Sequence, residues 1–148
     1  MLIRPVEEKD FAQWLHMSVE LWPQVPSSEH EQEMRECFGR ETSAVFVAEI
    51  PGGHLVGFLE ANIRYYAEDC ATYNVGYIEG WFVEADFRRQ GVGAALVHAA
   101  QTWALAKGCR EMASDCYLDN AMSLAAHQAV GYKETSRLIH FVKLLKQD

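Results

Sequence analysis

The chain has 148 residues, of which 49% are apolar and 23% charged, a composition that fits one folded domain over residues 1–148 and excludes a disordered chain. Its formal net charge of −8 disfavours nucleic acid and anionic membranes as partners, since both attract basic surfaces. The N-terminus lacks the apolar core of a signal peptide and no apolar run approaches the ~20 residues that span a bilayer, so we expect a cytoplasmic protein.

The cysteines favour reduced thiols and predict no metal site. They form no Cys-x-x-Cys pair and have no histidine at metal-ligand spacing. The four are Cys37, Cys70, Cys109 and Cys116.

Hydrophobic periodicity in the first half predicts a strand, two helices and a hairpin. Prolines end the first helix, a Ser27-Ser28 cap begins the second, and the many acids of the second favour an exposed outer face. A Pro-Gly-Gly turn joins the two hairpin strands. The expected elements are a strand over 1–6, helices over 7–22 and 29–38, and strands over 42–50 and 54–66.

The second half continues with strands and helices in alternation. Its expected elements are strands over 75–83 and 109–116, helices over 91–108 and 120–131, and one or two final strands over 132–145. Helices before and after the strands in chain order predict a mixed sheet packed between helices.

The stretch FRRQGVGAAL at 87–96 raises the question of a phosphate site. A dinucleotide fingerprint would need a third glycine after the first strand, and a P-loop would need Gly-Lys-Ser or Gly-Lys-Thr, so both are excluded. A strand-loop-helix remains, in which unpaired backbone N–H groups at a helix N-terminus bind phosphate oxygens. The alternative is a solvent-exposed turn.

In the phosphate interpretation, two glycines let a ligand approach the backbone and two arginines add charge. The residues of this candidate site are Arg88, Arg89, Gln90, Gly91, Val92, Gly93 and Ala94.

The Arg-x-x-Gly-x-Gly pattern, the preceding WFVEADF, Asn120 and the Gly131-Tyr132 pair resemble the GCN5-related N-acetyltransferases (GNAT family). The resemblance implies an α+β (α/β/α) GNAT fold: a mixed, mostly antiparallel central sheet of six to seven strands flanked by four helices. It also implies that the glycine loop grips the pyrophosphate of acetyl-CoA, with no metal required.

The family further implies that the strand over 77–83 splays from its neighbour. The backbone of Trp81, Phe82 and Val83 would then pair with the pantetheine arm, and one N–H there would polarise the thioester carbonyl. Asn120 matches a position that contacts the cofactor arm, although it also fits an ordinary helix N-cap.

YIEGWFV, CREMASD, HQAVGYKETSR and the LWP at 21–23 resemble, more specifically, the aminoglycoside 6'-N-acetyltransferases within that family. An aminoglycoside is a polycation, so its site needs carboxylates. Glu79 and Asp115 are the candidates, on adjacent strands, for binding ammonium groups or for accepting a proton from the amine. The alternatives are an exposed or ion-paired strand residue for Glu79 and a turn carboxylate for Asp115.

Trp22 and Tyr66 match aromatic residues that line the sugar site in this group, since aromatic faces stack on sugar rings. Trp22 also fits a core position. His127 stands where the wider family often has a tyrosine that protonates the departing thiolate, and it could act in the same way or simply pack. Ser136 stands where this group can carry an acid, which puts substrate range in doubt.

The first hypothesis is therefore direct acetyl transfer to the 6'-amine of an aminoglycoside, conferring antibiotic resistance. No cysteine has an activating partner for a covalent route. The alternatives are acetylation of a polyamine, metabolite or peptide amine, and a non-catalytic acyl-CoA-binding module. The apolar run RLIHFVKLL at 137–145 offers an edge for a homodimer.

Overall fold

A computed structural model describes residues 1–146. The chain divides into two compact units, Met1–Asp115 and Cys116–Asp148, each described below by itself. The sequence-based expectation of one acetyltransferase domain over the whole chain stays a prediction.

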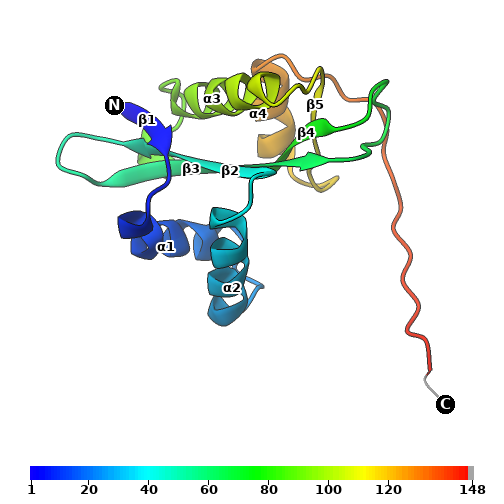
Figure 1. Ribbon diagram of the computed structural model, residues 1–148, viewed down its shortest axis with the longest axis horizontal. Helices are drawn as coiled ribbons and strands as arrows, with labels where there is room; N and C mark the ends of the chain where they lie inside the picture. The colour runs from blue at the N-terminus through cyan, green and yellow to red at the C-terminus, as the bar shows by residue number, and fades with distance from the viewer. Residues whose placement is uncertain (147–148) are drawn as a thin grey trace. The chain divides into compact units, whose positions relative to one another are not determined.

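The first unit is built on a five-stranded mixed sheet (Figure 1). The strands follow one another across the sheet in chain order; the first four are antiparallel and the fifth is parallel to the fourth. Their bounds are β1 Leu2–Pro5, β2 Ser43–Glu49, β3 Leu55–Arg64, β4 Val75–Val83 and β5 Met112–Ser114. The predicted mixed, mostly antiparallel sheet is confirmed, and β5 is shorter than the run that suggested it.

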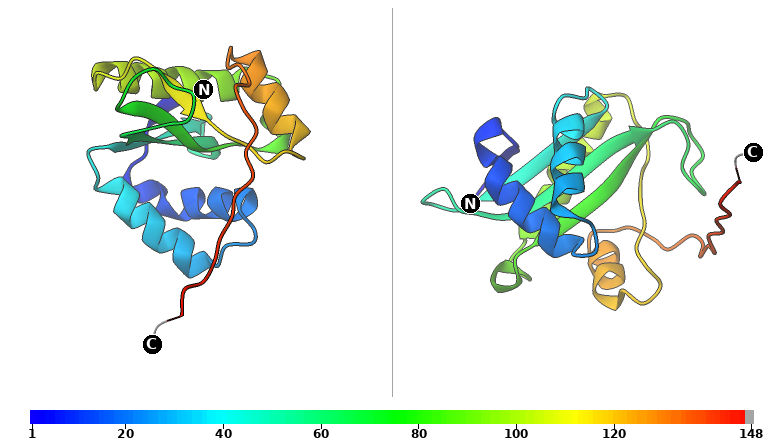
Figure 2. Two further views of the ribbon diagram at one scale, coloured as in Figure 1. Left: turned by 90° about the vertical axis from the view of Figure 1, so that its right-hand side faces the viewer. Right: turned by 90° about the horizontal axis from the view of Figure 1, so that it is seen from below.

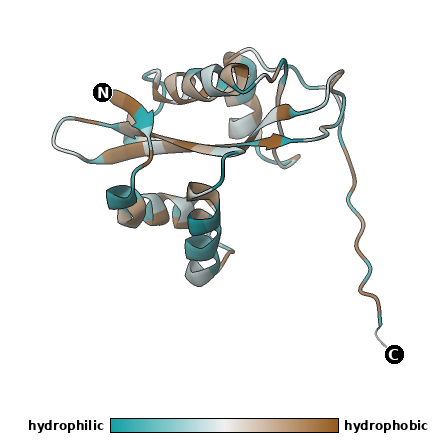
Figure 3. Ribbon diagram, in the orientation of Figure 1, coloured by the Kyte–Doolittle hydropathy of each residue, from teal (hydrophilic) through white to brown (hydrophobic). Residues whose placement is uncertain are grey.

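Helices cover both faces of this sheet. α1 (Phe11–Leu21) and α2 (Ser27–Phe38) lie against one face, and α3 (Val92–Ala106) lies against the other (Figures 1 and 2). Ser27 lies inside α2, contrary to its predicted capping role, because Pro26 takes the extended N-cap conformation. Most of α2 is hydrophilic (Figure 3), in keeping with the outer face predicted from its acids.

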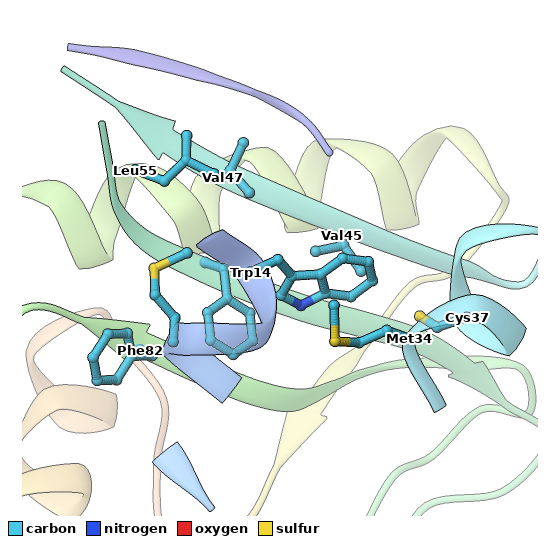
Figure 4. Packing of buried hydrophobic residues seen from close by; sticks show 9 residues of the cluster. Trp14, Met34, Cys37, Val45, Val47, Leu55 and Phe82 are labelled. Atoms are coloured by element: carbon cyan, nitrogen blue, oxygen red, sulfur yellow. The ribbon is translucent and has the colours of Figure 1, made fainter. Parts of the chain in front are cut away.

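The core between the sheet and the first two helices is centred on Trp14, which is fully buried. Its indole packs with Met34 and Cys37 of α2 and Val45 of β2 (Figure 4). The apolar face of α1 therefore packs against the sheet.

The second unit contains α4 (Ala121–Ala129), which confirms the last predicted helix and gives four α-helices in the described chain. The final strands are a wrong prediction: none of residues 132–146 belongs to a strand, so the described sheet has five strands in place of six to seven. A strand needs a neighbour for its backbone hydrogen bonds. The apolar side chains that suggested burial are instead exposed, up to 94% for Val142.

Candidate active site

A pocket of about 470 Å³ opens in the first unit between α2 and the strands β3 and β4. Four of its lining residues are glutamates and one is an arginine, so the wall is strongly acidic. The lining consists of Trp22, Val25, Glu29, His30, Glu33, Cys37, Arg40, Ser43, Glu60, Ala61, Asn62 and Glu79. A cavity of this size and charge suits a polycationic small molecule.

A β-bulge places Glu79 in this pocket. Across the β3–β4 ladder Glu60 pairs with Gly80, and the next residue, Ala61, pairs with Ile78, so Glu79 has no counterpart on β3. An extra residue in one strand bends it and redirects the side chain. The sequence placed Glu79 on a strand but could not show the bulge that turns it toward the acidic wall.

Glu79 is bound by Arg64, the last residue of β3. The guanidinium donates to both carboxylate oxygens, at 2.5 and 3.1 Å. The same guanidinium lies 3.5 Å from the centre of the Tyr77 ring, and the Glu79 hydrogen bond raises the pKa of Arg64. The ion-paired alternative for Glu79 therefore holds in this structure, together with its position in the pocket wall.

Asp115 follows β5, which pairs directly with β4, so the predicted placement of the two carboxylates on adjacent strands is correct. The Tyr77 hydroxyl donates to Asp115 at 2.5 Å. Burial, with this bond second, raises the pKa of Tyr77. Asp115 does not line the pocket itself; Tyr77 and Arg64 connect it to Glu79.

Glu60 is a site residue that the sequence analysis missed. Its side chain is only 8% exposed, and burial, followed by the charges of Glu33 and Glu79, raises its pKa to about 7. The indole N–H of Trp14 favours the charged form, although the contact falls short of hydrogen-bond geometry. The sequence signal for Glu60 was the single acid in the mostly apolar strand run LVGFLEANI.

Trp22 lies where both of its predicted roles are possible, and its contact with a sugar ring stays a prediction. It lines the pocket and also packs against the hydrophobic core. Its indole stacks with His30, whose Nε2 lies 3.1 Å from the Trp22 carbonyl oxygen. The Trp22 ring lies directly over Gly80, and a Cβ added at Gly80 would lie 2.4 Å from the ring. Only glycine at this position leaves room for Trp22 in the pocket wall.

Tyr66 is 56% exposed in the loop after β3 and is not part of the pocket lining. The charge of Glu68 raises its pKa. In the same loop Tyr65 and Tyr73 stack with ring centres 4.9 Å apart. The contact of Tyr66 with a sugar ring therefore stays a prediction.

The glycine loop leads into α3 as the sequence suggested. Gly91 is the N-cap with φ of 84°, a conformation that favours glycine, and the space beside it is open. The first-turn N–H groups of Val92, Gly93 and Ala94 precede the helix hydrogen-bond ladder. At Gly93 an added Cβ would lie 3.1 Å from the Trp81 ring, a second reason for glycine there beside the predicted ligand approach.

The side chains of this loop also stabilise its path. Arg88 Nε donates to the Val83 carbonyl at 2.8 Å, and the Gln90 amide donates to the Asp86 carbonyl at 3.0 Å. Arg89 adopts a positive φ of 61°. Phosphate binding by these residues stays a prediction.

The outer edge of β4 has the geometry expected for a cofactor arm. β5 pairs with β4 only at Gly76, Tyr77 and Ile78. Beyond Ile78, in the part of the chain that the structure describes, β3 is the only strand beside the remainder of β4. The stretch Trp81, Phe82 and Val83 therefore offers a backbone edge to a ligand.

Two candidate residues lie in the second unit. Asn120 is the N-cap of α4, where its side chain accepts the Ser123 N–H at 3.1 Å, so the capping alternative holds. His127 Nδ1 lies 2.7 Å from the Ser123 carbonyl, and its ring meets Tyr132 edge-on. Roles for either side chain toward acetyl-CoA stay predictions.

No group of metal-ligating side chains occurs among residues 1–146. In the same range no helix combines the length and apolar character needed to cross a bilayer.

Comparison with known proteins identifies the relatives of this chain. The model of the acetyltransferase (GNAT) family matches residues 11–132. An aminoglycoside N(6')-acetyltransferase type 1 of Klebsiella aerogenes is 46% identical over 147 residues, 97% of each chain. Another of the same name, from Acinetobacter genomosp. 13, is 40% identical over 97% of this chain and 98% of its own.

Solved structures of aminoglycoside 6'-N-acetyltransferases have the same fold as this chain. AAC(6')-Iy in complex with the bisubstrate analogue CoA-S-monomethyl-acetylneamine superposes with a TM-score of 0.92, at 36% identity, over 97% of this chain and 98% of that one. AAC(6')-Ih from Acinetobacter baumannii gives a TM-score of 0.93 at 36% identity, over 98% and 99%.

Proposed function

The chain belongs to the GNAT family of acetyltransferases, and we propose that it transfers the acetyl group of acetyl-CoA to the 6'-amine of aminoglycoside antibiotics, conferring resistance. The observation that carries the proposal is the pocket with four glutamates beside the open edge of β4. Near-complete coverage of relatives with this activity in their names supports the choice of substrate.

On the donor side, the residues of the chain fit a bound acyl-CoA. The N-terminus of α3, with open space at Gly91, would hold the pyrophosphate through Val92, Gly93 and Ala94, and Arg88 or Arg89 would add charge. The β4 edge at Trp81 to Val83 would align the pantetheine arm and donate one N–H to the thioester carbonyl. Acetyl-CoA supplies an activated acetyl group, so no metal is needed.

On the acceptor side, the pocket binds and orients the amine. Aminoglycoside amines are largely protonated at neutral pH, so one must lose a proton before its nitrogen attacks the thioester. Glu79 or Asp115 accepts that proton directly or through water. The Arg64 and Tyr77 contacts keep both carboxylates in fixed orientations. The amine then attacks in one step, and the CoA thiolate leaves with a proton, for which His127 is a candidate donor.

The binding experiment compares two variants. Glu79→Gln and Asp115→Asn remove charge with little change in shape, so they should weaken kanamycin binding while leaving acetyl-CoA affinity unchanged. Calorimetric titration of each ligand separately measures both. Unchanged binding of both ligands in both variants would show that the acceptor site lies elsewhere.

A second part of the proposal is a homodimer. Six apolar residues near the end of the described chain are more than half exposed: Leu138, Ile139, Phe141, Val142, Leu144 and Leu145. So many exposed apolar side chains within eight positions mark an interaction surface. We infer that a second copy of the chain covers this segment, which we call the terminal apolar segment.

A further inference from the structure

Two buried carboxylates in the first unit, Asp10 and Glu60, differ in their hydrogen-bond and ion-pair partners. Asp10 is 3% exposed and accepts from Arg4 at 2.7 and 2.9 Å and from the Glu7 N–H at 2.7 Å. These bonds, led by the one from Arg4, lower its pKa. Asp10 is thus a structural carboxylate whose lone pairs are used within the fold.

Glu60 is almost as buried as Asp10, at 8% exposed, but it lacks such partners. Among residues 1–146 no cationic side chain forms an ion pair with it, and the Trp14 indole N–H is the one group there that favours its charged form. A buried carboxylate without a cation or a set of hydrogen bonds is costly to the fold. Glu60 is one of the residues that line the pocket, so a ligand in the pocket can be the partner that its carboxylate lacks.

The like charges around Glu60 favour the binding of a cation beside it. The titratable or charged groups that face the same pocket are Glu29, His30, Glu33 and Cys37 from α2, Arg40 after it, and Glu79 from β4. Glu33 and Glu79 repel the Glu60 charge, and Arg64 already binds Glu79. Glu60 is therefore the pocket carboxylate that is both buried and available.

We propose that Glu60 is a further substrate-binding residue, whose carboxylate binds one ammonium group of the cationic acceptor at the inner wall of the pocket. The inference rests on the proposed aminoglycoside substrate. It would add a carboxylate from β3 to the two predicted acceptor carboxylates, Glu79 of β4 and Asp115 after β5.

If Glu60 binds an ammonium group, ligand binding should release a measurable fraction of a proton. With a pKa of about 7, the Glu60 carboxyl is about half protonated at pH 7 in the free protein. A bound ammonium favours the ionised form, so ligand binding drives the remaining proton into solvent. A carboxylate with an ordinary pKa is already ionised at pH 7 and would release none.

The test is calorimetric titration with kanamycin at pH 7, without acetyl-CoA, in two buffers of different ionisation enthalpy. We expect the wild-type protein to release a proton fraction that Glu60→Gln abolishes, and the variant to bind at least about tenfold more weakly, as for a lost charged hydrogen bond. Glu31→Gln on exposed α2, outside the pocket, removes the same charge and should behave as wild type. Equal proton release and equal affinity in wild type and Glu60→Gln would overturn the proposal.

Failure of this inference is distinguishable from failure of the proposed function. If wild-type protein binds no aminoglycoside, the substrate assignment is wrong, and spermidine replaces kanamycin as the cationic probe for Glu60. Carbon-13 NMR of glutamate carboxyls in the wild-type chain gives a second readout. One resonance should titrate near pH 7 and move to lower pH when the cation binds; its absence in the free protein would overturn the inference.

Discussion

Arg64 and Glu79 form a two-point ion pair, with both guanidinium contacts at 3.1 Å or less, at the residue where β4 bulges. The bulge turns Glu79 into the pocket and Arg64 fixes its orientation there. A catalytic or substrate-binding carboxylate needs such a rigid support, because small displacements of reacting groups cost large factors in rate.

Arg64→Gln should lower kcat/KM for the aminoglycoside by at least about tenfold, since a hydrogen bond to a charged group contributes ~1.5–3 kcal/mol. The affinity for acetyl-CoA should stay unchanged. Arg35→Gln, on the exposed side of α2, is the charge-matched control. Steady-state kinetics with each substrate varied in turn measures the effect; an unchanged kcat/KM in Arg64→Gln would refute a supporting role for the ion pair.

Gly80→Ala should displace the Trp22 ring, because the added Cβ would lie 2.4 Å from it. We expect a loss of stability of about 1–3 kcal/mol from this overpacking, together with a raised KM for the aminoglycoside. Gly39→Ala, where no atom lies within 4 Å of the added Cβ, provides the control. Urea unfolding and kinetics on both variants check this, and a Gly80→Ala protein with wild-type KM would exclude Trp22 from the acceptor wall.

Glu60→Gln should stabilise the protein at neutral and higher pH. The folded-state pKa of about 7 lies above the ordinary value of 4.5, so the folded chain retains a proton that the unfolded chain loses, and wild-type stability falls as pH rises between these values. The gain for Glu60→Gln should approach about 3 kcal/mol above pH 7 and vanish below pH 4.5. Unfolding curves of both proteins from pH 4 to 8 measure the difference; a difference that does not vary with pH would contradict the raised pKa.

Replacing part of the terminal apolar segment should dissociate the proposed dimer. Phe141, which is 89% exposed within one chain, would be buried against the second copy. Phe141→Asp should therefore shift sedimentation at micromolar concentration from dimer to monomer, whereas Lys143→Asp alters a polar position of the same segment and should have a smaller effect. A wild-type protein that sediments as a monomer would defeat the proposal.

Patterns local in sequence predicted the elements of the first unit well. The Pro-Gly-Gly hairpin, the apolar face of α1 and the Gly91 turn into α3 each depend on a few neighbouring residues, and each is confirmed. The antiparallel pairing of β2 with β3 follows from the short turn between them.

Features that depend on packing across the sheet were not predictable. The bulge at Glu79 depends on the β3–β4 register, and the importance of Glu60 depends on its burial beneath α1 and α2. The strands predicted over 132–145 are absent from the described residues 132–146, because a strand also needs a neighbouring backbone, which an apolar composition does not provide. The contact between Gly93 and the Trp81 ring also depends on such packing.

The most direct test of the proposed function is the release of CoA thiol from acetyl-CoA with kanamycin, tobramycin, spermidine and a peptide amine assayed in parallel. The acidic pocket and the relatives of the chain predict rapid turnover with the two aminoglycosides and little with the other amines. Turnover confined to spermidine or to the peptide amine would contradict the aminoglycoside assignment.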